Sequence, residues 1–429
     1  MNADTPMLTP ADARELLLAA AKPFAATETL DTLQANRRVL AVDVVSPLDV
    51  PPADISAMDG YAVRSADVAT PGTQLRVSQR IPAGHPPRAL EAGTAARIFT
   101  GAQLPEGADT VVIQEETTAD GDRVTFQVSP SAGANINRQG ADIRAGAAIL
   151  KAGCRLDAQA LGLAASVGRA SLTVFRRPKV AVFFTGDELT MPGEPLRAGA
   201  IYNSSRFTLC TLLDNLGCEV TDLGIVPDRL DATREVVRRA AQGHDLVLTS
   251  GGVSVGEEDH VKAAVEAEGR IDMWRIAMKP GKPLAFGEIH DRSSAPVPGV
   301  QAVSDTIGGT SEAKGRSVYF IGLPGNPVSS FITFVLFVRP FLLKLQGASR
   351  LDPHGWMIKA NFAQKKAERR HEYLRARIGD DGGLELFTNQ SSAVLTSTVW
   401  ADGLIDNPPG HLIEAGEPVR FMPFSDLLY

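Results

Sequence analysis

The sequence predicts a multidomain protein of α/β plus β type, with a central α/β domain built on a parallel sheet. The chain has 429 residues, which is too many for one hydrophobic core and suits two to four domains. Between residues 178 and 345, strand-like apolar runs alternate with helical runs, an order that implies a parallel sheet with right-handed crossovers. Short β-like runs with Pro and Gly turns dominate residues 46–146 and 346–429.

The N-terminal part predicts a discontinuous helical domain, residues 1–45 with 147–177, around a mostly-β domain at 46–146. Residues 8–40 read as helical, with Thr9 as N-cap and Pro10 at the first helical position of "TPADARELLLAAAKPF". The later helix "DAQALGLAASVG" is expected to pack against this one. The strands expected in between are "TAARIFTG", "DTVVIQEE" and "RVTFQVS".

The central domain, residues 178–345, has the clearest pattern. Its expected strands are "KVAVFFTG", "CEVTDLGIV", "HDLVLTSGG", "DMWRIAM", "PLAFGEI" and "SVYFIGLPG". Its expected helices start near Asn203, Asp228, Asp259 and Asn326, residue types that cap helices, with Pro327 at the first turn of the last helix. Residues 291–316 are rich in Ser, Gly, Ala and Pro and read as a surface insertion, and residues 346–429 read as a terminal β domain with a barrel-like fold.

Composition excludes several classes of protein. The net charge of −7 argues against a general nucleic-acid binder. The three scattered cysteines give no zinc signature and suit a reducing compartment. No secretory signal is visible at the N-terminus. The most apolar stretch, "FITFVLFVRPFLL", is interrupted by Arg339 and Pro340 and reads as too short to span a bilayer. A cytoplasmic protein with no membrane and no nucleic-acid partner is expected.

Four loops are expected at the carboxyl edge of the parallel sheet, where ligands of α/β folds bind. They are "TGDEL", "IVPD", "TSGGVSVGEED" and "GLPGNP". Glycines such as Gly251, Gly252 and Gly256 expose backbone N–H groups that can hold an oxyanion. The alternative is that these Gly and Pro residues only form turns.

Three acids come from the same edge: Glu188, Asp228 and Asp259. Carboxylate oxygens are ligands that Mg²⁺ takes beside substrate phosphates, and a bound Mg²⁺ would turn the repulsion between acids and anion into attraction. The sequence therefore predicts an anion site with a metal, unless Asp228 and Asp259 are simple helix caps.

Two lysines and three residues of the β domain complete the candidates. "MKPGKP" fixes Lys279 and Lys282 on a stiff turn that suits a multiply charged oxyanion, although such pairs are often solvated surface lysines. "DISAMDGYAVRSAD" places Asp59 at a turn. Thr100 and Asp142 lie at other Gly-rich corners of the same domain.

Taken together, "SAMDGYAVR", "TGDEL", "SGGVSVGEEDH", "KPGKP" and "GLPGNPVS" resemble, in order, the MoeA family of molybdopterin molybdenumtransferases, over about residues 8 to 425. The resemblance implies a four-domain homodimer whose α/β domain is similar to the MogA adenylylating fold. It implies insertion of molybdenum from molybdate into adenylylated molybdopterin, with Mg²⁺-dependent release of AMP. It also implies a MogA-type adenylyltransferase and molybdoenzymes as possible partners.

The resemblance also assigns roles to residues. It implies catalytic roles for Asp59, Thr100, Asp142, Glu188, Asp228 and Asp259, the last three also as metal ligands. It implies substrate binding by Ser250, Gly251, Gly252, Ser254, Gly256, Lys279, Lys282, Pro324, Gly325, Asn326, Arg375 and Ser391 or its neighbour Ser392. The chain departs from the family pattern at Arg275, where a lysine is expected, and at Asn203 and Ser204, where an acid and a threonine are expected.

Two other functions stay open at this point. A gephyrin-like scaffold would keep the fold but needs neither Asp59 nor the lysine pair. A nucleotide-processing enzyme of the CinA type would share the α/β fold but would leave "SAMDGYAVR" and the terminal β domain unexplained.

Overall fold

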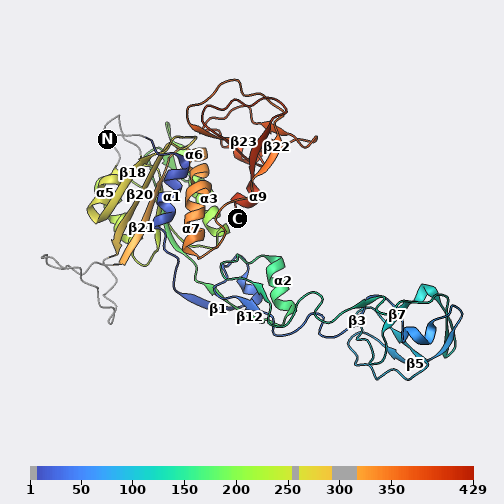
Figure 1. Ribbon diagram of the computed structural model, residues 1–429. Coiled ribbons are helices and arrows are strands. Elements are labelled where there is room, and N and C mark those ends of the chain that lie inside the picture. The colour runs from blue at the N-terminus through green and yellow to red at the C-terminus, as the bar shows by residue number, and fades with distance from the viewer. Residues whose placement is uncertain (1–6, 254–259, 292–315) are drawn as a thin grey trace, which may run out of the picture.

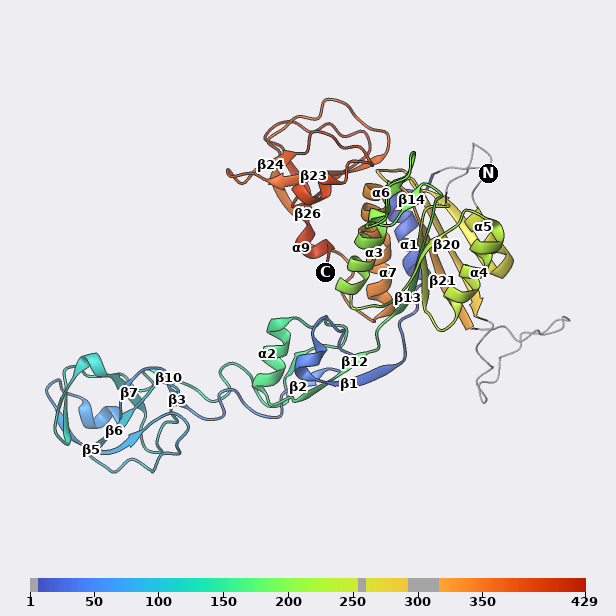
Figure 2. The same ribbon diagram turned by 180° about the vertical axis from the view of Figure 1, so that it is seen from behind.

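The computed structural model describes residues 7–253, 260–291 and 316–429 and shows an elongated molecule (Figures 1 and 2). The α/β body and the C-terminal β body lie at one end, a small body containing α2 lies in the middle, and a β body lies at the other end. Each body has its own buried apolar cluster. The predicted insertion falls almost entirely at residues 292–315, outside the described residues.

The α/β body is built on a six-stranded sheet of order β16-β13-β17-β21-β20-β18. Its strands are β13 (Lys179–Thr185), β16 (Glu219–Val226), β17 (Leu246–Ser250), β18 (Gly269–Arg275), β20 (Pro283–Asp291) and β21 (Arg316–Leu323). The first four strands of that order are parallel. β20 and β18 are antiparallel additions at the edge.

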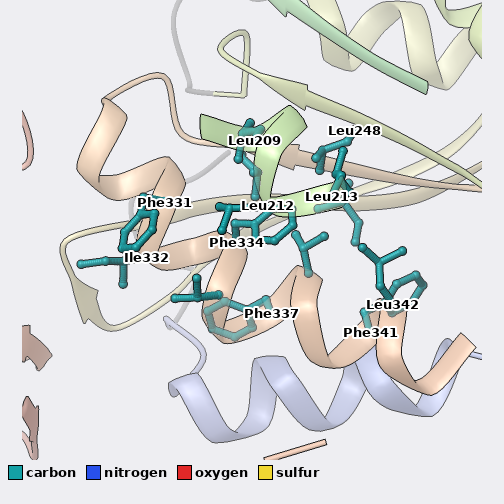
Figure 3. Packing of buried hydrophobic residues seen from close by; sticks show 14 of the residues in the cluster. Leu209, Leu212, Leu213, Leu248, Phe331, Ile332, Phe334, Phe337, Phe341 and Leu342 are labelled. Atoms are coloured by element: carbon teal, nitrogen blue, oxygen red, sulfur yellow. The ribbon is translucent and has the colours of Figure 1, made fainter. Parts of the chain in front are cut away.

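Helices cover both faces of this sheet. They are α1 (Pro10–Ala20), α3 (Ser204–Asn215), α4 (Leu230–Ala241), α5 (His260–Glu268), α6 (Pro327–Thr333) and α7 (Arg339–Leu345). Along β13, Val180, Val182 and Phe184 join the cluster with α1, α3, α6 and α7, whereas Ala181 and Phe183 join the cluster with α4 and α5. This alternation follows from the two-residue period of a strand. Figure 3 shows part of the first cluster, to which Leu209 and Leu213 of α3, Phe334 and Phe337 belong.

The longest helix contains a local irregularity with an identifiable cause. A π-helical turn, η4 (Phe334–Val338), joins α6 to α7. Pro340 has no N–H to give to the Leu336 carbonyl and its ring crowds that turn, so the helix widens there. The segment Pro327–Leu345 has the length and composition to cross a membrane, contrary to the expectation that it is too short. Because 89% of it is buried within the protein, it reads as a core helix.

The N-terminal helix differs from its predicted place. Thr9 caps α1, its side chain accepting the Asp12 N–H, and Pro10 is the first helical residue, both as predicted. However, Ala13 and Leu17 pack in the α/β core, and α1 contacts α7 rather than α2. The remainder of the segment expected to be helical forms β1 (Thr27–Asp31) and one short 3₁₀ turn, η1 (Thr32–Ala35).

The middle body is therefore not a helical domain. It combines α2 (Ala158–Ser166), capped by Asp157, with two short antiparallel pairs. These pairs join β1 to β12 (Ser171–Phe175) and β2 (Val44–Val45) to β11 (Ala148–Leu150). The helix buries only small side chains, Ala160 and Ala164, so strands supply much of the core.

The distal β body has a six-stranded sheet of order β7-β4-β6-β5-β9-β8. Its elements are β3 (Ile55–Ser56), β4 (Gly60–Val63), η2 (Ser65–Val68), β5 (Gln74–Ile81), β6 (Thr94–Ile98), β7 (Thr110–Ile113), η3 (Gln114–Glu116), β8 (Thr117–Asp120), β9 (Arg123–Phe126) and β10 (Ile136–Asn137). Each of the three strand motifs quoted from the sequence contains one of these strands.

The C-terminal body has a sheet of order β19-β23-β25-β26-β22, with β24 beside β23. Its elements are β22 (Trp356–Lys359), β23 (His371–Ile378), β24 (Leu384–Leu386), α8 (Thr396–Trp400), β25 (Gly403–Asn407), β26 (Pro418–Pro423) and α9 (Phe424–Leu427). The remaining strand, β19 (Met278–Lys279), belongs to the α/β segment and pairs parallel with β23. This pairing attaches the C-terminal body to the α/β body next to the lysine turn.

Candidate active site

The carboxyl ends of the four parallel strands meet at a cavity of about 250 Å³. Four loops contribute to it, each directly after a strand, as the sequence predicts. Of the expected site residues, the cavity is lined by Glu188, Asp228, Ser250, Gly251, Gly252, Pro324 and Gly325. We call this space the rim cavity. The short strands β14 (Leu189–Thr190) and β15 (Ile201–Tyr202) flank it.

Backbone geometry at the rim cavity requires glycine. Gly251 has a φ of +99°, and a Cβ there would lie 2.5 Å from the Thr185 carbonyl oxygen. Gly252 has a φ of +65°, and its Cβ would lie 2.4 Å from Val261 of α5. L-amino acids with side chains avoid this region of φ, and there is no room for a side chain. The loop therefore presents bare backbone to the cavity.

The Ser250 hydroxyl is occupied in fixing the loops. It donates to the Pro324 carbonyl at 3.0 Å and lies 3.2 Å from the Ser330 hydroxyl of α6. These bonds are buried and join the end of β17 to the start of α6. Ser250 therefore holds two walls of the cavity together.

Two buried polar groups of the rim cavity have no hydrogen-bond partner among the described residues. They are Asn203 Nδ2 and Thr185 Oγ1, on residues only 1% and 4% exposed. The Asn203 carbonyl oxygen caps α3 by accepting the Arg206 N–H at 3.1 Å, which leaves its amide NH₂ unused. Buried polar groups without partners are rare, so both atoms fit a bound polar ligand. The sequence pattern indicated Asn203 as a cap and as a departure from the family pattern, and did not indicate Thr185.

The predicted metal ligands are only partly described. Glu188 and Asp228 line the same cavity, while Asp259, Ser254 and Gly256 lie outside the described residues. Asp228 is not the cap of α4, because Arg229 occupies that position and Asp228 precedes it. Two carboxylates on one cavity suit a hard cation such as Mg²⁺. Within the described ranges, no three His, Cys, Asp or Glu side chains form a potential metal cluster.

The lysine turn connects the rim cavity to the C-terminal body. Pro283 lines the cavity, and Lys279 in β19 lies opposite Glu372 of β23. The Lys279 ammonium is 3.2 Å from both Glu368 and Glu372, so it is not a free cation. Lys282 is exposed, and its side chain does not line the cavity. Gly281 holds the turn against α6, since a Cβ there would meet Thr333 Oγ1 at 2.5 Å.

The start of α6 and the loop after β24 approach the same junction. The Val328 N–H donates to the Ser392 carbonyl at 3.1 Å. Asn326 occupies the N-cap position of α6, but its side chain makes no capping bond. The residue before Ser392 is also held by a hydrogen bond: the Ser391 carbonyl accepts from Nη2 of Arg375 in β23 at 3.1 Å. Lys279, Asn326, Arg375 and Ser391 thus belong to segments that contact one another where the two bodies meet.

Arg375 is a buried cation with an unusual environment. Its side chain is 1% exposed, and its Nε donates to Ser397 Oγ at 3.1 Å. Among the described residues it has no carboxylate partner. Burial lowers the pKa of Arg375 to about 10. A buried charge without a counter-ion is costly, so this position suits a bound anion.

The distal β body keeps its candidates away from the rim cavity within one chain. Asp59 Oδ1 accepts the Thr100 N–H and the Thr100 hydroxyl, both at 2.8 Å. These bonds, the N–H first, lower the pKa of Asp59, with Arg97 adding a smaller effect. Asp142 is exposed, and its side chain makes no hydrogen bond or ion pair with the described residues. Figures 1 and 2 show this body at the far end of the molecule from α6.

Comparison with known proteins identifies the family. Family models match as the MoeA N-terminal region, domains I and II (residues 8–168), a probable molybdopterin binding domain (181–344) and the MoeA C-terminal region, domain IV (358–424). A molybdopterin molybdenumtransferase of Haemophilus influenzae is 40% identical over 98% of this chain and 100% of its own length. The chain belongs to the MoeA family.

Other MoeA relatives agree. The molybdopterin molybdenumtransferase of a Nostoc species is 38% identical over 77% of this chain and 71% of its own. Two solved structures of the MoeA protein of Pyrococcus horikoshii match with TM-scores of 0.73 and 0.78, at 28% and 25% identity. They cover 98% and 97% of this chain and 99% and 100% of theirs. These matches confirm the predicted multidomain α/β plus β fold and the predicted enzyme class, a molybdopterin molybdenumtransferase of molybdenum-cofactor biosynthesis.

Proposed function

We propose that the protein inserts molybdenum from molybdate into adenylylated molybdopterin, with Mg²⁺-dependent release of AMP. The observation that carries this proposal is the rim cavity, which combines bare glycine backbone, two unpartnered buried polar groups and two carboxylates. Such a cavity can hold a phosphate-bearing ligand by positioning and charge neutralisation, without a strong nucleophile. A purely structural scaffold would not need these unpartnered groups.

Each rim residue has a distinct task in this proposal. The backbone of Gly251 and Gly252 approaches the phosphates, and the Asn203 amide donates to the pterin nucleotide. Glu188 and Asp228, with Asp259, would hold the Mg²⁺, which neutralises the phosphoanhydride when bound. Ser250 acts indirectly by fixing Pro324 and α6. Ser254 and Gly256 extend the same loop, and Pro324, Gly325 and Asn326 form the opposite wall.

Molybdate binding is proposed at the junction with the C-terminal body. Molybdate is a tetrahedral dianion, which fixed cations and N–H donors bind much as they bind phosphate. Arg375 supplies a buried positive charge, and Lys279 and Lys282 lie on the rigid turn that leads to the rim cavity. Because Glu368 and Glu372 hold Lys279, molybdate would have to draw this ammonium away from them. Ser391 and Ser392 would add polar contacts from the facing loop.

The proposal requires a homodimer. Asp59, Thr100 and Asp142 can reach a rim cavity only if that cavity belongs to a second subunit. The rim cavity of their own subunit lies at the opposite end of the elongated molecule. An apolar surface on the middle body supports this, because Leu33 is 86% exposed beside Leu161 of α2. The enzyme would act in the cytoplasm, receive its substrate from a MogA-type adenylyltransferase and deliver cofactor to molybdoenzymes.

The direct test combines the purified protein with adenylylated molybdopterin, molybdate and Mg²⁺ and measures AMP release. Asp59→Asn should abolish release, whereas Asp120→Asn, an exposed acid of the same body, should leave it intact. Normal release by Asp59→Asn would contradict the proposed role.

A mixing experiment tests the shared site. Asp59→Asn and Lys279→Ala subunits, each inactive alone, should recover about a quarter of full activity when mixed. Random pairing places one subunit of each variant in about half of the dimers, and each of these heterodimers has one intact site out of two. No recovery in a mixture that demonstrably exchanges subunits would refute a site built from two chains.

A further inference from the structure

A second, larger cavity lies far from the rim, where the middle body meets the α/β body and the last helix α9. Its volume is about 780 Å³, within the range of small-molecule sites. Its walls include Arg37 and Arg155 of the middle body, Arg339 of α7, and Arg350 and Asp426 near α9. Neither the proposed reaction nor the family motifs use any of these residues.

Two of these arginines, one half-buried and one buried, have a nitrogen without a partner in the described ranges. Arg155 Nε and Arg339 Nε are buried and make no hydrogen bond among the described residues. Arg339 is only 7% exposed, and its other nitrogens reach the Leu351 carbonyl at 3.0 Å and the main-chain oxygen of Tyr429, the last residue of the sequence, at 3.4 Å. Arg155 Nη2 likewise donates to a carbonyl, that of Asn215, at 2.8 Å.

The carboxylates of the cavity wall already have other partners. Asp157 caps α2. Asp352 pairs with Arg14 at 2.6 Å, and Asp426 pairs with His354 at 2.7 Å and Arg350 at 3.8 Å. None of the ion pairs in the described part of the chain includes Arg37, Arg155 or Arg339. Three guanidinium groups therefore share a cavity in which none of them forms an ion pair with a described residue, and Asp352 and Asp426 act on Arg339 only from a longer distance.

The arginines also affect one another. Burial, followed by the charge of Arg155, lowers the pKa of Arg339 to about 10, while Asp426 and Asp352 partly oppose these effects. Burial and the charge of Arg37 lower the pKa of Arg155. Arg37 itself lies 5.4 Å above the Tyr429 ring, so an aromatic face borders the cluster. Close like charges in a partly buried space favour a multivalent anion.

We propose that this cavity is an oxyanion site for a phosphate group, free or carried by a small molecule, bound by Arg37, Arg155 and Arg339. Guanidinium groups bind phosphate through paired N–H donors, which would use the two orphaned Nε atoms. Because Arg155 comes from the middle body and Arg339 from α7, the bound anion would fasten these two bodies together.

Calorimetric titration of the full-length protein at constant ionic strength tests this site, with inorganic phosphate, pyrophosphate and AMP as separate probes. At least one probe should bind with a component that Arg155→Gln and Arg37→Ala each weaken about tenfold or more. Arg123→Ala, an exposed arginine of the distal body, should change that component less than twofold. The preferred probe shows whether the phosphate is free or carried by a nucleotide.

The rim cavity is also expected to bind oxyanions, so the two sites must be separated. Asn203→Ala should weaken only the component that survives Arg155→Gln. The proposal is overturned if no probe shows a component that depends on Arg155. It is equally overturned if Arg155→Gln and Arg37→Ala dissociate a dimer while no anion binds, because a side chain of a second copy would then fill the cavity.

Discussion

Replacing Arg375 by methionine should separate the functional from the structural role of this buried cation. Burial lowers its pKa well below the usual arginine value, to about 10, and each pKa unit corresponds to about 1.4 kcal/mol, so the buried charge destabilises the fold by about 3 kcal/mol. The bonds from Nε to Ser397 and from Nη2 to Ser391 return about 1 kcal/mol each. Methionine is unbranched and of similar length. Arg375→Met should therefore raise the free energy of unfolding by about 1 kcal/mol.

Urea unfolding followed by tryptophan fluorescence measures this change. On a Trp274→Phe background, only Trp356 and Trp400 of the C-terminal body report. Arg420→Met is the control, since Arg420 is 48% exposed and pairs with Asp406, and it should cost at most about 1 kcal/mol. A loss of more than about 2 kcal/mol in Arg375→Met would refute the reasoning.

The functional half of the prediction concerns molybdate. Arg375→Met should raise the molybdate concentration required for half-maximal AMP release by about tenfold or more, the effect of losing one charge-assisted contact. Arg420→Met should leave it unchanged. If both variants respond alike, the molybdate site does not include Arg375.

Two further predictions concern backbone space and acid stability. Gly281→Ala should lower the free energy of unfolding by about 2–4 kcal/mol in thermal unfolding, because φ is +101° and the new Cβ would meet Thr333. The control is Gly193→Ala, which has a φ of +98° but open space around the new Cβ and should cost about 1 kcal/mol. Equal losses in the two variants would disprove the steric argument. Burial alone would raise the pKa of Asp245, but bonds from Arg176 and a backbone N–H outweigh it and lower that pKa. Its contribution should thus be complete above the unfolded-state pKa of about 3.9 and be lost as pH falls through the lower folded value. Asp245→Asn should flatten this acid dependence of the unfolding free energy.

The fold of the α/β body was predictable because its signals are local. The strand runs, the Thr9 and Asn203 caps and the Pro327 start appear in the structure where the sequence puts them, whereas Asp228 lies one residue before the N-cap of α4. The position of α1 was not predictable. An apolar helix face indicates that the face is buried, but it does not indicate which part of the protein covers it. The antiparallel direction of β20 could have been predicted from the length of the connection before it. Residues 276–282, between β18 and β20, are too few for the crossover of a dozen or more that a parallel pair needs.

The rim residues were predictable for a geometric reason, since the carboxyl ends of parallel strands must share one edge. The junction was harder, because its contacts join residues far apart in sequence. Lys279 looks like a free cation until β23 brings Glu372 beside it, 93 positions later. The same pairing explains why the turn is rigid: β19 fixes one end to the C-terminal body, Gly281 packs on α6, and Pro283 ends at the rim cavity. A movement of the C-terminal body would therefore be transmitted to the cavity through five residues.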